Sequence, residues 1–101
     1  MIIYNVTTKV HDSIHQEWLA WVKEEHIPGI LETGCFTHAH ILRLLETDDG
    51  EGPTYAIQYH TGNIEMYNRY VEQHAGTMQR KSFEKWGDLF IAFRSVLEVV
   101  N

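Results

Sequence analysis

Two alternating sets of side chains make up residues 2–10, and many of them are β-branched. A period of two with β-branched residues is typical of a β-strand. Similar patterns predict strands over roughly residues 35–46, residues 54–61 and residues 89–100. The segment 47–53 is rich in Asp, Gly and Pro. It predicts a turn that joins the second and third strands as a hairpin.

Two further segments repeat apolar residues at helical spacing. Ile14, Trp18, Trp21 and Val22 fall on one face at about 100° per residue, which predicts a helix that begins at Asp12 or Ser13. His26 lies at the edge of this face, so we expect it to be half-buried.

Residues 63–80 show a second helical pattern, and Asn63 is expected to cap that helix. A short extra helical turn is predicted over residues 82–87, with Ser82 as its N-cap and Gly87 at its end.

The order of these elements is β-α-β-β-α-β, the ferredoxin-like arrangement. The sequence therefore predicts an α+β fold in which a four-stranded antiparallel sheet carries both helices on one face. Both sides of the last predicted strand are largely apolar, with Ile91, Phe93 and Leu97 on one side and Phe90 and Ala92 on the other. Because the helices cover only one face, we expect a second copy of the chain to cover the other and form a homodimer.

Composition narrows the class of protein. A chain of 101 residues predicts one domain over residues 1–101. The formal net charge of −6 disfavours nucleic acid and anionic membranes as partners. No bilayer-spanning apolar run or signal-peptide pattern is present, and Cys35 is the single cysteine, so we expect a cytoplasmic protein. Small molecules and other proteins are the expected partners.

The segment His26-Ile27-Pro28-Gly29 is the first candidate for chemistry. Pro28 lacks an amide hydrogen and its ring clashes with the carbonyl four residues earlier, so the helix is expected to kink or stop there. His26 is then a candidate catalytic residue, as a general base or as an axial metal ligand beside a pocket. The alternative is a structural histidine whose charge complements the helix dipole.

Large aromatic residues are the candidates for contact with a ligand. An aromatic surplus in a small domain suits a cavity for a small planar molecule, although aromatic residues at these spacings are also typical of a core. Arg94 shares a strand face with apolar residues, and if it is buried or half-buried it needs an anionic partner: Glu98, a carboxylate across the dimer, or a ligand. A structural ion pair is the favoured interpretation. The candidate ligand-binding residues are Trp18, Tyr55, Tyr59, Tyr67 and Trp86.

His38 and His40 lie two residues apart on a predicted strand, so their side chains point the same way. They could share a metal ion if another element supplied a third ligand. No zinc-binding motif accompanies them, and we expect polar histidines near a sheet edge or dimer interface instead. The sequence accordingly predicts no metal and no cofactor.

Several segments carry a resemblance to known proteins: residues 23–28, 33–36, 41–45, 52–59 and 82–94. Together they closely resemble a family of small bacterial proteins catalogued as a domain of unknown function. More distantly, the Trp-rich helix that ends in His-x-Pro is similar to that of dimeric α/β-barrel proteins. These include cofactor-free quinone-forming monooxygenases, muconolactone-isomerase-like enzymes, proteins of ethyl tert-butyl ether degradation and haem-binding relatives. The resemblance implies a dimer with a cavity that the matching histidine, His26, faces.

Two hypotheses follow. The protein is either a dimeric module without catalytic activity, or a small-molecule binding protein or cofactor-free enzyme, of the monooxygenase or isomerase kind, with His26 at the pocket. A pocket of a few hundred Å³ that His26 reaches would favour the second hypothesis.

Overall fold

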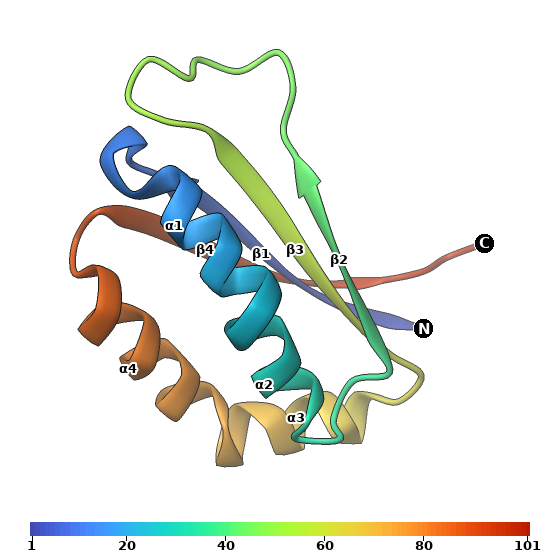
Figure 1. Cartoon of the computed structure of the whole chain (residues 1–101). Helices are drawn as coiled ribbons and strands as arrows, with labels where there is room; N and C mark the ends of the chain where they lie inside the picture. The colour runs from blue at the N-terminus through green and yellow to red at the C-terminus, as the bar shows by residue number, and fades with distance from the viewer.

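A four-stranded antiparallel sheet forms one layer of the protein, as seen in a computed structural model that describes residues 1–101 (Figure 1). The strands lie in the order β2-β3-β1-β4, so β2 and β4 are the edges. Their bounds are β1 Ile2–Val10, β2 His38–Arg43, β3 Thr54–Thr61 and β4 Phe90–Glu98.

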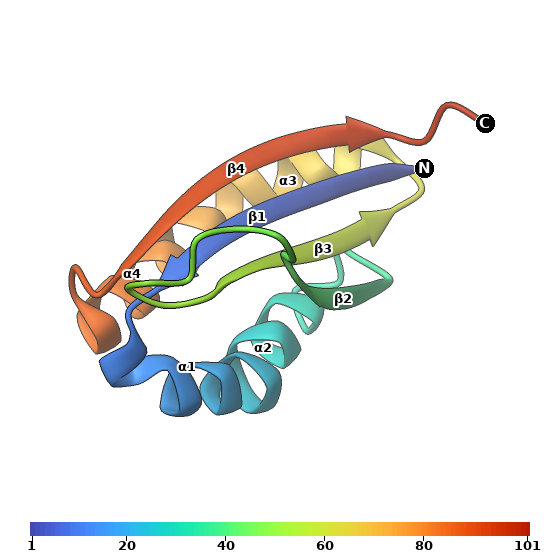
Figure 2. The ribbon, with the colours of Figure 1, turned by 90° about the horizontal axis from the view of Figure 1, so that it is seen from above.

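The helices form a second layer on one face of the sheet (Figure 2). The first helical segment joins β1 to β2, and the second joins β3 to β4. The resulting β-α-β-β-α-β order confirms the predicted ferredoxin-like α+β fold. The first segment consists of η1 Asp12–Ile14, α1 His15–Trp21, η2 Val22–His26 and α2 Ile27–Leu31, and the second of α3 Ile64–Gln73 and α4 Ala75–Trp86.

The helix before Pro28 does not stop where the sequence predicts. It passes through a π-helical turn, η2, and continues as α2, with Pro28 in the first turn of that helix. The amide of Ile27 donates to the carbonyl of Val22, five residues back, which is the π-helical spacing. Inside a continuous helix a proline removes one backbone donor and clashes with the carbonyl four residues earlier, so regular α-helical spacing is not kept at this point. At the position where a kink or stop was predicted, the helix therefore has a π turn instead.

Several helix and strand ends differ from the predictions. The first helical segment is capped by His11, whose Nδ1 accepts from the amide of Ser13, rather than by Asp12 or Ser13. Ser82 is not an N-cap: it lies inside α4, and its hydroxyl donates to the carbonyl oxygen of Met78. The second strand is shorter than residues 35–46, because Cys35 and Phe36 are buried beside the sheet before β2 begins.

The two faces of the sheet differ in burial. Tyr4 of β1 and Tyr59 of β3 are buried under the helices, with ring centroids 5.9 Å apart, and Tyr70 of α3 packs on Tyr4 from above. On the outer face, Ile91 and Phe93 of β4 are 59% and 67% exposed. The molecule therefore has one closed core and one uncovered, partly apolar sheet face. None of its helices has the length and apolar character needed to cross a membrane.

Candidate functional site

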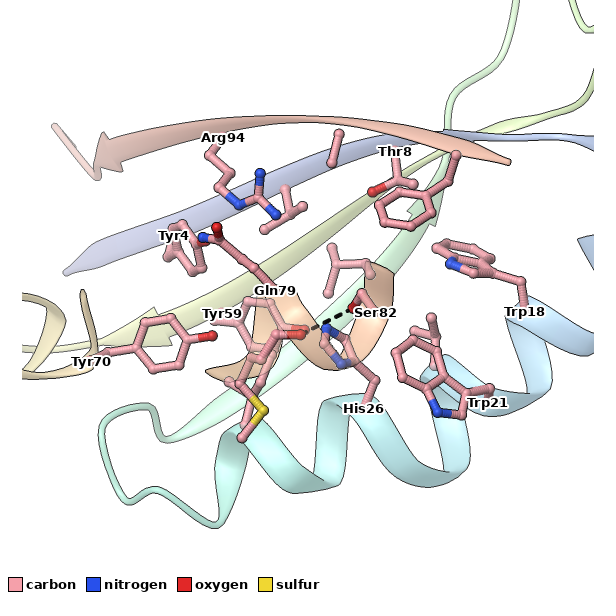
Figure 3. A pocket seen from close by; sticks show the side chains of 17 residues that line it. Tyr4, Thr8, Trp18, Trp21, His26, Tyr59, Tyr70, Gln79, Ser82 and Arg94 are labelled. Carbon is pink, nitrogen blue, oxygen red and sulfur yellow. Dashed lines mark hydrogen bonds between the residues drawn. The ribbon is translucent and has the colours of Figure 1, made fainter. Parts of the chain in front are cut away.

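A pocket lies between the sheet and the helix layer (Figure 3). Its cavity volume is about 40 Å³, and the space between the lining atoms is about 500 Å³ when open solvent is counted with it. The cavity itself holds a few water molecules, so a small organic molecule would have to extend into the open mouth. Twelve of the 17 lining residues are hydrophobic. The polar or charged lining residues are Thr8, His26, Gln79, Ser82 and Arg94.

The π-helical turn orients His26 toward this pocket. In a regular α-helix, four residues turn by about 400°, which would place His26 roughly 40° past Val22 and further from the centre of the apolar face. A π turn advances by only about 80° per residue, so the same four residues bring His26 back over Trp18. His26 lines the pocket and is half-buried, as predicted, and its ring stacks on Trp21 with centroids 4.6 Å apart.

His26 is poised as a neutral hydrogen-bonding group. Burial, together with the positive charges of Arg94 and Lys81, lowers the pKa of its imidazole from 6.5 to about 4. At neutral pH the ring is therefore uncharged and keeps one nitrogen lone pair. No protein group forms a hydrogen bond with the ring, so both nitrogens are free for a ligand.

Arg94 reaches the pocket from the sheet side, opposite the helix that carries His26 (Figure 3). The predicted ion pair with Glu98 is not formed: the protein has two ion pairs, Arg43 with Asp49 and Arg80 with Glu84, and neither involves Arg94. No aspartate or glutamate lines the pocket either. Arg94 is exposed, so water can solvate its guanidinium; it is the one formally charged group on the pocket wall at neutral pH, and no carboxylate of the chain pairs with it.

Three tyrosines supply the remaining hydroxyl groups of the pocket. Burial raises the pKa of Tyr4, Tyr59 and Tyr70 above the usual value of 10. All three hydroxyls therefore remain protonated at physiological pH and can donate hydrogen bonds. For Tyr4, the adjacent Arg94 guanidinium opposes the effect of burial. The wall consequently offers hydroxyl donors and one cation to a ligand.

The structure brings some predicted ligand-binding residues to the pocket and leaves others in the core. Trp18 and Tyr59 line it together with His26. Tyr55 does not: its hydroxyl binds Nε2 of His15 at 2.6 Å, and its ring packs on Trp18.

Trp86 is a core residue as well, and Tyr67 is partly buried against the core. The ring of Tyr67 packs on Tyr4 with centroids 5.7 Å apart, and Trp86 contacts Trp21 edge-on at 5.9 Å. Both are therefore aromatic neighbours of lining residues rather than lining residues themselves.

Tyr4, Tyr70 and Gln79 also line the pocket, although none of them is among the residues predicted from the sequence. Tyr4 shares a strand face with Val6 and Thr8, and this alternation was a usable signal. Gln79 and Tyr70 lie on opposite sides of the break between α3 and α4 at His74. A continuous helix through residue 80, which the sequence predicted, could not have placed them correctly.

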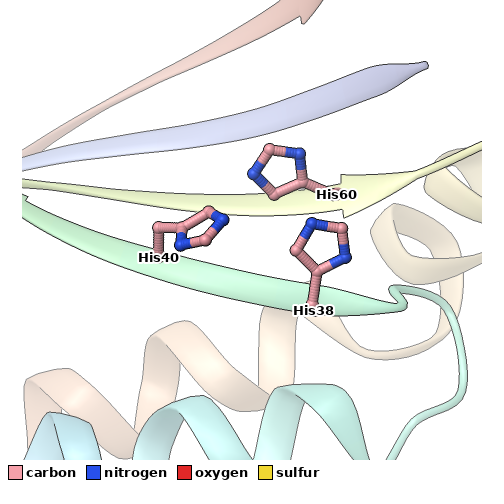
Figure 4. A group of neighbouring side chains, drawn as sticks. All are labelled: His38, His40 and His60. Carbon is pink, nitrogen blue, oxygen red and sulfur yellow. The ribbon is translucent and has the colours of Figure 1, made fainter.

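His38 and His40 occur together with a third histidine that the sequence analysis did not connect to them. His60 of β3 lies opposite His38 of β2, on the outer face of the sheet and away from the pocket (Figure 4). Burial, together with the nearby His38 and His40 rings, lowers the pKa of His60. The three rings form a histidine cluster separate from the pocket.

The sequence of the chain matches a family model along nearly its whole length. The model describes a domain of unknown function, DUF4286, and it matches residues 1–100. The chain belongs to the DUF4286 family. This membership confirms the resemblance to a family of unknown function. A comparison with curated proteins finds no match to this DUF4286 chain.

Solved structures share the fold at low sequence identity. A dimeric ferredoxin-like protein from an uncultured marine organism superimposes with a TM-score of 0.71 at 15% identity, covering 99% of this chain and 95% of that chain. SnoaB, a cofactor-independent oxygenase from Streptomyces nogalater, gives 0.70 at 10% identity, covering 99% and 93%. An EthD-family protein from Bacillus halodurans gives 0.65 at 11% identity, covering 99% and 100%. These similarities show that the DUF4286 chain has the ferredoxin-like fold of those proteins.

Proposed function

We propose that this DUF4286 protein binds a small planar aromatic anion, or a weakly acidic aromatic hydroxyl compound, in the pocket between sheet and helices. The observation that carries the proposal is the charge of the wall: Arg94 lines it without an ion-pair partner, and no carboxylate lines it. The positive charge of the pocket is opposite in sign to the net charge of the chain, which is −6. A ligand with a negative charge would pair with Arg94 in place of solvent.

His26 complements Arg94 in holding such a ligand. Its uncharged ring offers one donor and one acceptor, and neither is used by the protein. A bound anion would offset the positive field of Arg94 and Lys81 that lowers the pKa of His26. The pKa of His26 then rises on binding, which favours transfer of a proton from an acidic ligand hydroxyl to the imidazole.

The ring of the ligand is held by aromatic side chains. Trp18 and Trp21 line the pocket on the helix side, and Tyr59 lines it on the sheet side. Stacked or edge-on contacts with such rings favour a flat ligand over a branched aliphatic one. Met78 adds a flexible side chain that can adapt to the shape of the ligand.

A cofactor-free enzyme is the second candidate function. The unoccupied imidazole of His26, next to a cation that stabilises an anion, is the arrangement needed to remove a proton from an acidic aromatic substrate. SnoaB, which has the same fold, is described as a cofactor-independent oxygenase. Oxygen consumption in the presence of the bound compound distinguishes such an enzyme from a binding protein.

Binding is tested with probes of one ring system and different charge: 2-naphthoate, 2-naphthol and naphthalene. The tryptophan fluorescence of the protein reports binding, because Trp18 and Trp21 line the pocket. We expect 2-naphthoate to bind roughly tenfold more tightly than naphthalene, which corresponds to about 1.4 kcal/mol. Arg94→Met should abolish this preference, whereas Arg69→Met, on the exposed surface of α3, should leave it unchanged. Equal affinities of the wild type for the three probes would refute the charged-ligand proposal.

We also propose that the protein forms a homodimer through the outer face of its sheet. Ile91, Phe93 and Leu97 of β4 are exposed on that face, and Leu42 of β2, at the opposite edge of the sheet, is 47% exposed on the same face. An apolar sheet face of this kind is stabilised when a second copy covers it. One of the structurally similar proteins is itself described as a dimeric ferredoxin-like protein, which supports the same arrangement here.

A further inference from the structure

The histidine cluster consists of His38, His40 and His60 on the outer face of the sheet (Figure 4). His38 and His40 are two residues apart on β2, so both side chains leave the same face of the strand. His60 of β3 pairs directly with His38 in the antiparallel register, which puts its side chain on that face as well. Three imidazoles from two adjacent strands therefore converge without any help from loops.

The spacing of the three rings fits a shared metal ion. One nitrogen from each ring lies within 4.8 Å of the others. Ligand nitrogens at about 2.0–2.1 Å from a tetrahedral zinc ion are about 3.3 Å apart, so small side-chain rotations close the site. The rings of His38 and His60 are already stacked, with centroids 4.3 Å apart, and His40 meets His60 edge-on at 5.2 Å.

Thr37 forms a hydrogen bond with His38 that orients its imidazole ring. Its hydroxyl donates to the backbone carbonyl oxygen of His60 at 3.2 Å and contacts Nδ1 of His38 at 2.8 Å. Because the hydroxyl has one proton, donation to the carbonyl means that it accepts from Nδ1–H of His38. The Nε2 atom of His38 then carries the lone pair. A hydrogen bond on the other ring nitrogen is how proteins orient histidine ligands of metals.

His60 offers a nitrogen that nothing in the protein uses. Its Nε2 atom is buried and has no hydrogen-bond partner. A buried polar atom without a partner costs free energy, so such atoms are rare unless a water, an ion or a function accounts for them. A metal ion shared with the two neighbouring rings would satisfy this nitrogen.

We propose that His38, His40 and His60 bind a divalent transition-metal ion such as Zn²⁺, with a fourth position open to water or another donor. Three imidazoles without a carboxylate favour zinc, copper or nickel over calcium or magnesium, which need oxygen ligands. Three protein ligands with an open fourth position is the form of catalytic rather than structural zinc sites. The site lies on the opposite face of the sheet from the pocket, the face that also carries the proposed dimer interface, and it does not depend on the proposed aromatic ligand.

The test is a Zn²⁺ titration of the purified, chelator-treated protein, followed by calorimetry, with Co²⁺ absorption spectra as a probe of the ligands. We expect one ion per chain. His60→Asn and His38→Asn should each weaken binding by about tenfold or more, since loss of a ligand costs at least as much as loss of an outer-shell contact. His11→Asn is the matched control, because it removes a histidine elsewhere while asparagine can still cap η1.

Two results would overturn the site. The first is Zn²⁺ affinity in His60→Asn equal to that of the wild type, which would reduce the cluster to a pair of surface histidines. The second is binding that saturates only at millimolar Zn²⁺, which would mean an adventitious ion only. Thr37→Val tests the positioning role of Thr37: we expect weaker Zn²⁺ binding by about tenfold and a changed Co²⁺ spectrum, whereas a merely structural threonine would alter neither.

Discussion

His26 must stay uncharged for the folded protein to be fully stable. Its pKa is about 4 in the folded state against 6.5 for a free imidazole. Stability is therefore fully present above pH 6.5 and falls as the pH drops toward 4, because the unfolded chain binds a proton that the folded chain resists. We expect this one residue to cost about 2 kcal/mol at pH 5 relative to pH 7.5.

Urea unfolding of the wild type and of His26→Gln at both pH values measures the effect. The other histidines and the carboxylates contribute equally to both proteins, so the difference between them isolates His26. We expect the variant to lose about 2 kcal/mol less than the wild type between pH 7.5 and pH 5. Parallel losses in the two proteins would show that the ring is already solvated in the folded state.

Gly52, in the turn before β3, has a backbone conformation and a close backbone contact that leave no room for a side chain. Its φ is +149°, and a Cβ atom there would overlap the backbone carbonyl oxygen of Val10. We expect Gly52→Ala to destabilise the protein by about 3 kcal/mol or more. Gly76→Ala is the control, because Gly76 is helical and an added Cβ has no atom within 4 Å. This control should be neutral or stabilising by up to about 1 kcal/mol in thermal unfolding. A small cost at Gly52 would mean that the turn can shift.

At the scale of whole elements, α3 depends on its N-terminal cap. The side-chain oxygen of Asn63 accepts from the amides of Glu65 and Met66 at 2.8 and 3.2 Å. We expect Asn63→Ala to lower the free energy of unfolding by about 1 kcal/mol, since two amides lose their acceptor. Asn68→Ala, on the exposed surface of the same helix, should change it by less than about 0.5 kcal/mol. Equal effects of the two substitutions would contradict a capping role.

The bounds of β1 and β3 could be predicted because both strands alternate strictly and end at turn residues. The cap at Asn63 was predictable for the same local reason. Other features could not be read from one sequence. The π-helical turn depends on how the chain accommodates Pro28 while His26 and Ile30 keep contact with the sheet. Whether the helix forms a π turn here is decided by tertiary packing and not by local helix propensity.

In the candidate sites, too, some residues could be predicted from local sequence and others depend on tertiary packing. His26 was predictable because it lies beside a proline at the end of an apolar helical stripe. His60 was not connected to His38 and His40, because strand register brings it beside them and register depends on pairing across the whole hairpin. Tyr55 does not line the pocket because its hydroxyl binds His15, and no spacing rule marks that partner.

At the scale of the whole molecule, a pair of substitutions can distinguish a specific dimer interface on the sheet from non-specific association through exposed apolar residues. Phe93 on the outer sheet face and Phe83 on α4 have almost the same exposure, 67% and 63%. We expect Phe93→Glu to convert the dimer to a monomer and Phe83→Glu to leave it intact, in size-exclusion chromatography with light scattering at micromolar concentration. A charge placed in a buried interface without a partner is costly, whereas one on an exposed helix face is not. A monomeric wild type would refute the dimer.

The π-helical turn is also the part of the first helical segment that should tolerate the deletion of one residue. A π turn holds one residue more than the α-helix that would span the same distance, so η2 contains a residue that the helix can lose. A chain lacking Glu24, which is exposed in that turn, would return to α spacing and still point His26 and Ile30 inward. Removal of Ala20 from the regular helix α1 would instead rotate one half of the helix against the other by about 100°. We expect the first deletion to leave 2-naphthoate binding intact and the second to abolish it. A natural relative whose first helical segment is one residue shorter would then lack this π turn.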